Sequence, residues 1–252
     1  FFFKQKTAYE IPKRDWSSDV CSSDLIALSI NSPGGTPVQA ALIAGRIRKL
    51  AEEKKIPVFA FAEDVAASGG YWLATAADEI FADENSIIGS IGVVSGGFGF
   101  TALIDKIGVQ RRLYTSGERK AMLDPFLDEK PDDIARLRAI QNDIHEAFKA
   151  QVRGRRGSRL KGDEEELFSG EFWTGKHALE LGLIDGIGDL RGVMRQRFGD
   201  DVKLRLVGAH RPWWRRRLAG GASLGFAADG GEFASGLLAA IEERLWWNRF
   251  GL

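Results

Sequence analysis

Apolar runs and amphipathic segments alternate along the chain from residue 26 onward. Three apolar runs have the length and composition of buried strands, at residues 26–30, 57–62 and 79–82. The segment between the first two shows helical spacing of its apolar residues and opens with Thr36-Pro37, a pair typical of a helix start. Strand, helix, strand, helix, strand is the order of right-handed β-α-β units. The pattern therefore predicts an α/β fold with a largely parallel sheet and repeated β-α units.

After the third run the pattern becomes more helical. It predicts a short helix around residues 103–107, a long amphipathic helix from about 132 to 152, further helices around 178–179 and 193–194, and strands at 111–115 and 202–207. One face of the long helix is apolar, with Ile134, Leu137, Ile140, Ile144 and Phe148. The arginine-rich stretch 153–161 lies beside the acidic stretch 163–166, and this charge pattern indicates a solvated surface between helices.

The two ends of the chain differ in character from residues 26–207, which we predict to form the main domain. Residues 1–25 show no helical or strand period and resemble translated sequencing-adapter DNA, so we expect a foreign, disordered segment. The genuine protein is then expected to begin upstream, with strands or an anchor that this sequence does not contain. Residues 208–252 are predicted to be an extension with a terminal amphipathic helix. Its Trp and Arg residues favour docking on the protein or on a partner subunit, with a membrane surface as the alternative.

The composition limits the classes of partner and cofactor. Thirty-five basic and thirty-five acidic residues cancel, so net charge does not indicate a nucleic-acid partner. The single cysteine, Cys21, excludes an internal disulfide framework and a multi-cysteine metal site. No run approaches the roughly 18 apolar residues of a membrane span. The sequence predicts no metal and no cofactor.

The stretch Ala66 to Tyr71 (Ala-Ala-Ser-Gly-Gly-Tyr) has the most specific setting for a nucleophile. Ser68 follows the second apolar run and precedes a second helical segment, so it is predicted to lie at a strand-to-helix turn. Such a turn exposes a hydroxyl at the edge of a sheet and directs the first N–H groups of the helix toward a bound substrate. The alternative is an ordinary serine N-cap, which is the simpler explanation for this stretch taken alone.

A nucleophilic serine needs a general base. The chain contains three histidines, His145, His177 and His210, and none lies in a glycine-rich turn or at the end of a predicted strand. A Ser-His-Asp arrangement is therefore disfavoured.

Lysine is the alternative base. Lys120 ends the stretch Ser-Gly-Glu-Arg-Lys, just beyond the strand predicted at residues 111–115, and active sites of α/β proteins gather at the ends of parallel strands. A lysine accepts a proton only when its amine is neutral, which requires a dry pocket. We predict Lys120 as the base, and the alternative is a solvated cation beside Arg119.

Glycines are placed where an oxyanion hole and a substrate groove are needed. The N–H groups of Gly34 or Gly35, after the first strand, and of Gly69, after Ser68, are the predicted oxyanion donors. The stretch 87–97 is too rich in glycine for a regular element and too apolar for a solvated linker. We predict that it is a packed loop near the site or an assembly contact, in which Ile91 and Val93 contribute to an apolar groove for an extended peptide.

Four stretches now carry a family resemblance: Asn-Ser-Pro-Gly-Gly at 31–35, Ala-Ala-Ser-Gly-Gly-Tyr at 66–71, Gly-Ser-Ile-Gly-Val at 89–93 and Ser-Gly-Glu-Arg-Lys at 116–120. Their order and spacing resemble those of the Ser-Lys signal peptide peptidases, the SppA/SohB-like family. The resemblance covers residues 26 to about 207.

The resemblance implies a ClpP/crotonase-type fold and a Ser-Lys dyad in which Ser68 is the nucleophile and Lys120 the general base. It also implies a serine endopeptidase that cleaves signal-peptide remnants or other membrane-associated peptides, in the bacterial cell envelope. In this family the dyad is completed within a ring-like homo-oligomer, so Lys120 is expected to serve Ser68 of a neighbouring subunit.

Two other classes of function stay open from the sequence. The crotonase branch of the same fold includes acyl-CoA hydratases and hydrolases, which would bind CoA thioesters and leave Ser68 unlabelled by an acylating probe. A non-catalytic, membrane-associated scaffold is the second alternative. It is favoured if Lys120 is exposed to solvent and far from every Ser68 in the assembly.

Overall fold

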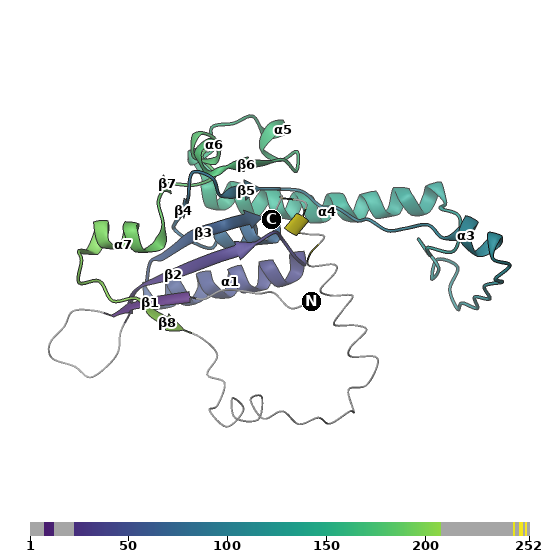
Figure 1. The fold of residues 1–252 in the computed structure, drawn as a ribbon, viewed down its shortest axis with the longest axis horizontal. Coiled ribbons are helices and arrows are strands. Elements are labelled where there is room, and N and C mark those ends of the chain that lie inside the picture. Colours follow the sequence, from purple (N-terminus) through teal and green to yellow (C-terminus); the bar gives the residue numbers. More distant parts are fainter. Residues whose placement is uncertain (1–7, 13–22, 208–243, 245–246, 249, 251–252) are drawn as a thin grey trace, which may run out of the picture.

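Eight strands form one sheet in the computed structural model, within the part of the chain that it describes: residues 8–12, 23–207, 244, 247–248 and 250 (Figure 1). The strands are β1 (Ala8–Pro12), β2 (Ser23–Ser32), β3 (Val58–Ala67), β4 (Glu79–Ala82), β5 (Ile87–Gly89), β6 (Phe172–Thr174), β7 (Gly186–Ile187) and β8 (Arg205–Val207). Their order is β6-β5-β3-β2-β1-β8, and β4 pairs with both β3 and β7.

Strand β3 is the central strand of the sheet. It runs parallel to β2, β4 and β5, and β4 runs parallel to β7. The pairs β1–β2, β1–β8 and β5–β6 are antiparallel. One edge of β3 is shared, because β4 pairs with residues 59–62 and β5 with residues 65–67. The predicted α/β class with a largely parallel central sheet is confirmed, and the arrangement is consistent with the ClpP/crotonase type.

Within residues 23–207, a helix is present at each place where the sequence pattern predicts one, and α5 is an additional short helix in the acidic stretch. The helices are α1 (Pro37–Lys54), α2 (Gly69–Ala74), α3 (Thr101–Lys106), α4 (Pro131–Arg156), α5 (Glu164–Leu167), α6 (Gly175–Glu180) and α7 (Leu190–Phe198), with a short 3₁₀ turn at Gly157–Arg159. Helix α1 starts at a proline in the first helical position and ends where Lys55 adopts a φ of +55°.

Both faces of β3 are buried, which explains why its sequence reads as a nearly continuous apolar run. On one face, Ala60 and Ala66 belong to the main core with the small residues Ala40 and Ala44 of α1. On the other face, Phe59 and Phe61 pack with Phe81 and Met194 in a second cluster. Small side chains on the α1 side let the helix lie close to the sheet.

Residues 111–115 do not form a strand, so that prediction is wrong. The segment is irregular and exposed, and its side chains make contacts within their own neighbourhood. Arg111 pairs with Asp124 and stacks over the ring of Phe126 at 4.8 Å. Residues with strand propensity form a strand only where a sheet edge accepts their backbone groups, and this segment is not part of the sheet. The placement of Lys120 at the end of a parallel strand therefore fails with it.

Part of the glycine-rich stretch 87–97 is a regular element after all, since residues 87–89 form β5. Gly89 makes this possible at a φ of +111°, where an added Cβ would lie 2.8 Å from the ring of Trp173 on β6. The rest of the stretch is irregular, as predicted.

The ends of the chain are described only in part. Residues 8–12, where the sequence shows no strand period, form β1 beside β2 and β8. The foreign origin of residues 1–25 stays a prediction. Beyond residue 207 only residues 244, 247–248 and 250 are described, so most of the predicted terminal helix lies outside the described residues. No helix among the residues described has both the length and the apolar composition needed to cross a bilayer.

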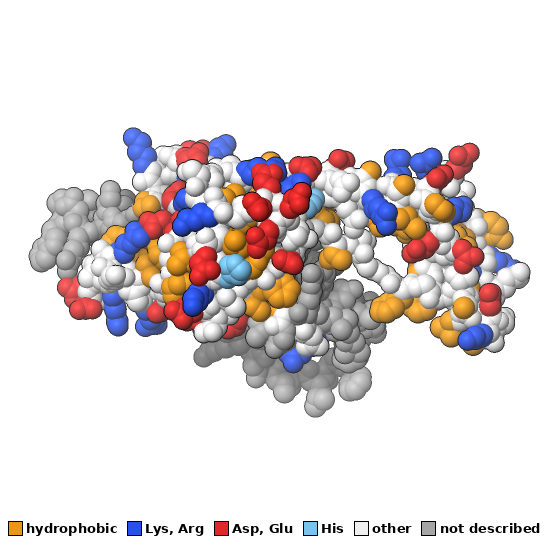
Figure 2. Space-filling model, turned by 90° about the horizontal axis from the view of Figure 1, so that it is seen from above, with side chains coloured by type: hydrophobic (Ala, Val, Ile, Leu, Met, Phe, Trp, Pro, Cys, Tyr) orange, Lys and Arg blue, Asp and Glu red, His pale blue; other side chains and the backbone are white. Residues whose placement is uncertain are grey.

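A projecting region, which we call the arm (residues 94–140), contains α3 and the first part of α4. Figure 1 shows α3 and the start of α4 far from the sheet, at the opposite end of the view from α7. Nine of the sixteen exposed large apolar side chains of the described residues belong to the arm: Val94, Phe98, Leu103, Ile107, Val109, Leu113, Tyr114, Leu127 and Ile140. Figure 2 shows such side chains among charged ones at this end of the molecule. The arm thus exposes apolar surface that a core would normally bury.

Candidate active site

Ser68 occupies the turn between β3 and α2, as predicted. Its backbone has a φ of +50° and a ψ of −120°, which is strained for a residue with a side chain. Two hydrogen bonds fix this conformation: the Ser68 N–H donates to the Gly89 carbonyl at 2.8 Å, and the Ser68 carbonyl accepts from the Trp72 N–H at 2.9 Å. Strain of this kind, of order 1–3 kcal/mol, persists only where the surroundings enforce it.

The hydroxyl of Ser68 makes no capping hydrogen bond to α2, although the residue occupies the N-cap position. This observation separates the two explanations of the serine, because an ordinary N-cap serine accepts a hydrogen bond from the second or third helical N–H group. The side chain of Ser68 is half-buried. A strained serine at a strand-to-helix turn, with a hydroxyl that does not cap the helix, is compatible with a nucleophile, and that role stays a prediction.

The glycine loop after β2 packs directly against the Ser68 turn. A Cβ on Gly34 would lie 3.1 Å from Ser68 Cβ and 3.4 Å from Ser68 Oγ. A Cβ on Gly69 would lie 3.2 Å from the Gly35 nitrogen, and one on Gly70 would lie 2.6 Å from the Ser32 carbonyl oxygen. The backbones of the two turns therefore touch, and the structure brings Gly34, Gly35 and Gly69 together around Ser68.

The segment after β5 runs beside the site. Ile91 is fully buried in the main core, while Val93 is only partly buried. His145 of α4 contacts the Ile91 carbonyl oxygen through Nε2 at 3.0 Å. His177 is exposed on α6, and His210 lies outside the described residues. The lining role of Ile91 and Val93 stays a prediction, and the partner that the structure gives His145 is a backbone carbonyl.

Lys120 is exposed on the arm, in an irregular segment in which its N–H donates to the Gly117 carbonyl at 3.2 Å. Lys120 lies between α3 and α4 in the sequence, and Figure 1 shows α3 and the start of α4 far from the end of β3, which Ser68 follows. Within the single chain described here, the structure does not bring Lys120 to Ser68.

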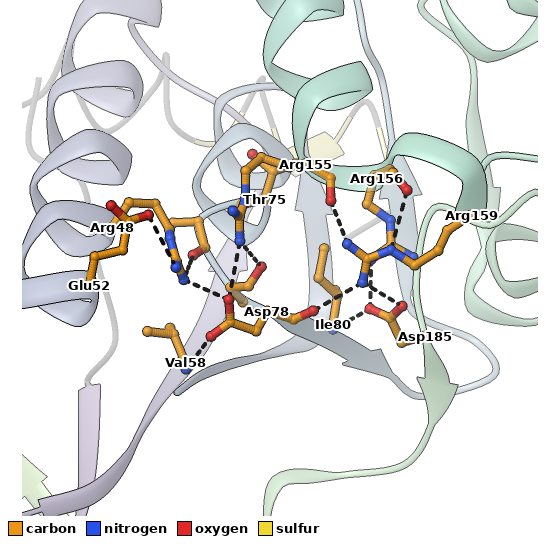
Figure 3. Close-up of polar contacts among 12 residues, drawn as sticks. Arg48, Glu52, Val58, Thr75, Asp78, Ile80, Arg155, Arg156, Arg159 and Asp185 are labelled. Carbon is orange, nitrogen blue, oxygen red and sulfur yellow. Dashed lines mark hydrogen bonds and ion pairs between the residues drawn. The ribbon is translucent and has the colours of Figure 1, made fainter. Parts of the chain in front are cut away.

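A network of arginines surrounds the other end of α2 (Figure 3). Four consecutive carbonyl oxygens, from Thr75 to Asp78, each accept a guanidinium hydrogen bond. Arg155 donates to Thr75 and Ala77, both at 2.9 Å, Arg48 donates to Ala76 at 3.2 Å, and Arg159 donates to Asp78 at 3.0 Å. We call Arg48, Arg155 and Arg159 the guanidinium clamp. The Asp78 carboxylate pairs with Arg48 at 2.8 Å and Arg155 at 3.3 Å, so it holds the clamp in place.

A buried charged group lies next to the clamp. Arg156, only 2% exposed, pairs with Asp185 at 2.6 Å and donates to the Gly182 carbonyl. Burial by itself raises the pKa of Asp185, but the hydrogen bond and charge of Arg156 outweigh it and hold this pKa below its ordinary value. Burial also raises the pKa of Tyr71, whose hydroxyl donates to the Leu183 carbonyl at 2.7 Å. The neutral phenol thus ties α2 to the segment before β7.

The interpretation of residues 153–161 as solvated charge is therefore wrong for Arg155 and Arg156. It holds for Arg153, which makes a bidentate pair with Glu164 on the exposed side of α4. A signal was present in the sequence, because Arg155 and Arg156 continue the helical face that Phe148 and Val152 bury. A run of charges hides such spacing when it is judged by composition alone.

Comparison with known proteins adds a family to this geometry. The model of a protein family described as Peptidase family S49 matches residues 50–203, which include the Ser68 turn, the arm, and Arg155 and Arg159 of the clamp. The chain belongs to peptidase family S49. A putative signal peptide peptidase SppA from Enterococcus faecium is 34% identical over 165 residues, 65% of this chain and 47% of that protein.

A longer match is a putative protease from Synechocystis, 31% identical over 233 residues, 90% of this chain and 80% of that protein. A protein from Brucella abortus named Na(+)/H(+) antiporter NhaA is 53% identical over 231 residues, 90% of this chain but 31% of that protein. The chain thus spans about a third of the length of the Brucella relative, and most of that protein lies outside the matched region.

Proposed function

We propose that this chain is a serine peptidase in which Ser68 is the nucleophile and Lys120 the general base. The observation that carries the proposal is the strained Ser68 turn, whose hydroxyl leaves α2 uncapped and packs against the Gly34-Gly35 loop. Membership of a peptidase family supports the same reaction class.

The proposed reaction follows from the chemistry of these groups. Ser68 Oγ attacks the carbonyl carbon of a peptide bond while its proton passes to the neutral amine of Lys120. The N–H groups of Gly69 and of the Gly34-Gly35 loop stabilise the oxyanion that forms. The ammonium of Lys120 then protonates the leaving amine as the C–N bond breaks. Water, deprotonated by Lys120, hydrolyses the acyl-enzyme and restores both side chains.

A second copy of the chain supplies the base in this proposal. Lys120 is exposed on the arm, and the arm exposes apolar side chains that an assembly would cover. Burial in that contact would give the amine the dry surroundings in which it is neutral. The proposed enzyme is therefore a homo-oligomer with a dyad shared between subunits.

The substrate class that we propose is an extended peptide derived from a membrane protein or signal peptide, bound beside β5 and residues 90–94. The name of the Enterococcus relative supports signal peptides. A location at the membrane of a bacterial cell envelope belongs to the same proposal.

The test is labelling by a fluorophosphonate probe, with the modified residue identified by mass spectrometry. Labelling at Ser68 is expected in the wild-type chain and should be lost in Ser68→Ala and reduced about 10²–10⁴-fold in Lys120→Ala. The exposed arm lysine in Lys106→Ala is the matched control and should label normally.

Mixing Ser68→Ala with Lys120→Ala tests the shared dyad. The mixture should recover peptide hydrolysis because one interface then pairs an intact Ser68 with an intact Lys120. Recovery is not expected if each chain uses its own lysine. A wild-type chain that assembles but is never labelled at Ser68 would favour the scaffold function, which the exposed Lys120 of the single chain also fits.

A further inference from the structure

Helix α2 is too short to hold its own position. It contains six residues and is about 9 Å long. Helices of this length are not stable in isolation, so the surroundings must fix where its first N–H groups point. Those N–H groups include Gly69, the donor of the proposed oxyanion hole. The placement of α2 is therefore a functional requirement and not only a packing detail.

Helix α4 contacts α2 through one face of its second half. Phe148 stacks on Trp72 with a centroid distance of 4.7 Å. Gln151 Nε2 donates to the Thr75 hydroxyl at 3.0 Å, and that hydroxyl donates to the Trp72 carbonyl at 2.6 Å. Arg155 completes the series with its two hydrogen bonds to the carbonyls of Thr75 and Ala77. Three residues at helical spacing thus hold both the side and the end of α2.

Arg155 is the central group of this contact. Its planar guanidinium reaches two carbonyls two residues apart, which a lysine with a single ammonium group does not reproduce in the same geometry. The side chain is about a quarter exposed and lies between the carbonyls and Asp78. A cation at this end of a helix also interacts favourably with the helix dipole.

We propose that Arg155 is a positioning residue for the oxyanion hole: by fixing the carboxyl end of α2 it sets the aim of the Gly69 N–H at the other end. This inference rests on the proposed function of Ser68. The inference predicts that loosening the clamp weakens transition-state stabilisation more than ligand binding. The reason is that the Gly69 N–H forms its strongest hydrogen bond with the oxyanion, which is present only in the transition state and the tetrahedral intermediate.

The experiment compares Arg155→Lys with Arg153→Lys. Both arginines lie on α4, two residues apart, and both guanidinium groups bond a carboxylate. Arg153, however, bonds Glu164 and stacks over Phe168, away from α2. The readout is inactivation by a fluorophosphonate probe at a series of concentrations. It separates the maximal inactivation rate from the half-saturating concentration. Thermal unfolding of each variant shows that the assay temperature lies below the transition.

Arg155→Lys is expected to lower the maximal rate about tenfold with the half-saturating concentration changed less than twofold, a smaller loss than the 10²–10³ of a deleted oxyanion donor. Arg153→Lys should match the wild type in both values. If Arg155→Lys is unfolded at the assay temperature, Gln151→Ala removes a neighbouring contact and should lower the maximal rate two- to fourfold. A maximal rate that is unchanged, or that falls only with the folded fraction, overturns the inference. Absence of labelling in the wild type would instead overturn the proposed function and this inference with it.

Discussion

The turn that carries Ser68 and the arm that carries Lys120 are built in opposite ways. At the turn, backbone packs on backbone, Gly69 and Gly70 are buried, and every neighbouring element contributes a hydrogen bond or a packing contact. On the arm, Phe98 is 79% exposed and Tyr114 is 89% exposed. One proposed catalytic group is thus held by its own fold, and the other lies on a surface that the described chain leaves open.

The difference indicates where control of the proposed site resides. A nucleophile whose strained backbone is enforced by the core is present whenever the domain is folded. A base on an exposed surface takes its place only when something covers that surface. Activity of the proposed peptidase then depends on assembly, whereas the conformation of the Ser68 turn depends only on folding of the chain. Substitutions in the core should therefore affect folding, and substitutions on the arm should affect association.

The largest expected effect on stability is for a buried residue of α4, compared with an exposed residue of the same helix on the arm. Phe148 is 3% exposed and stacks on Trp72, so Phe148→Ala should lower the free energy of unfolding by about 3–5 kcal/mol. Ile140, on the arm, is 45% exposed, and Ile140→Ala should change the free energy of unfolding by less than about 0.5 kcal/mol in the isolated chain. Urea unfolding measures this free energy for both variants. Equal losses in the two variants would show that the arm packs as tightly as the core.

The same contrast explains what the sequence could predict. Helix α1 and strand β4 were placed almost to the residue because their limits are local: a proline starts the helix, and a left-handed residue at Lys55 ends it. The Ser68 turn and the Gly34-Gly35 loop were also predicted, because glycine patterns record close backbone contacts. Their contact with each other depends on the parallel pairing of β2 with β3, which the order of elements implied.

What the sequence could not predict depends on distant partners. The short stretch Arg-Arg-Leu-Tyr-Thr at residues 111–115 resembles a strand by composition, but it does not join the sheet, and Arg111 pairs with Asp124 instead. Arg155 was assigned to solvent because charge dominates its neighbourhood. Its hydrogen bonds reach residues about 80 positions earlier in the chain, and nothing in the local composition records them. The family resemblance implies that Lys120 serves Ser68 of a neighbouring subunit, and this pairing stays a prediction because a single chain does not test it.

A polar substitution on the arm should affect association and leave folding intact. Phe98→Ser removes a large exposed apolar side chain of the proposed interface. We expect an unchanged thermal transition in dilute solution and a dissociation constant of the oligomer raised about 10- to 30-fold, the range of a strong interface residue. Analytical ultracentrifugation measures it. Val38→Ser, on the exposed side of α1, is the control. A Phe98→Ser variant that unfolds more easily as a monomer would mean that the arm stabilises its own chain.

Two glycines offer a finer test of the Ser68 turn. Gly34 has a φ of +142° and would place a Cβ against Ser68, so Gly34→Ala should destabilise the fold by about 1–3 kcal/mol. Gly45 lies exposed in α1 with no atom within 4 Å of an added Cβ, so Gly45→Ala should stabilise it by up to about 1 kcal/mol. The two substitutions add the same methyl group, but they are expected to change the free energy of unfolding in opposite directions. A destabilising Gly45→Ala would show that α1 is packed more closely than the structure indicates.

Acid gives the smallest predicted effect and acts on the clamp side of the core. Because Arg156 and the Ile80 N–H hold the pKa of Asp185 below its ordinary value of 3.8, the carboxylate contributes stability that is complete above that value. The contribution is lost as the pH falls through the lowered pKa, since the folded state must then take up a proton that its ion pair disfavours. Urea unfolding should show a modest decline in stability below about pH 4. Asp185→Asn leaves Arg156 buried without its carboxylate and should be less stable at pH 7, but its stability should decline less steeply in acid. If the stability of Asp185→Asn declined with falling pH as steeply as that of the wild type, the acid sensitivity would come from other carboxylates and not from the Asp185–Arg156 pair.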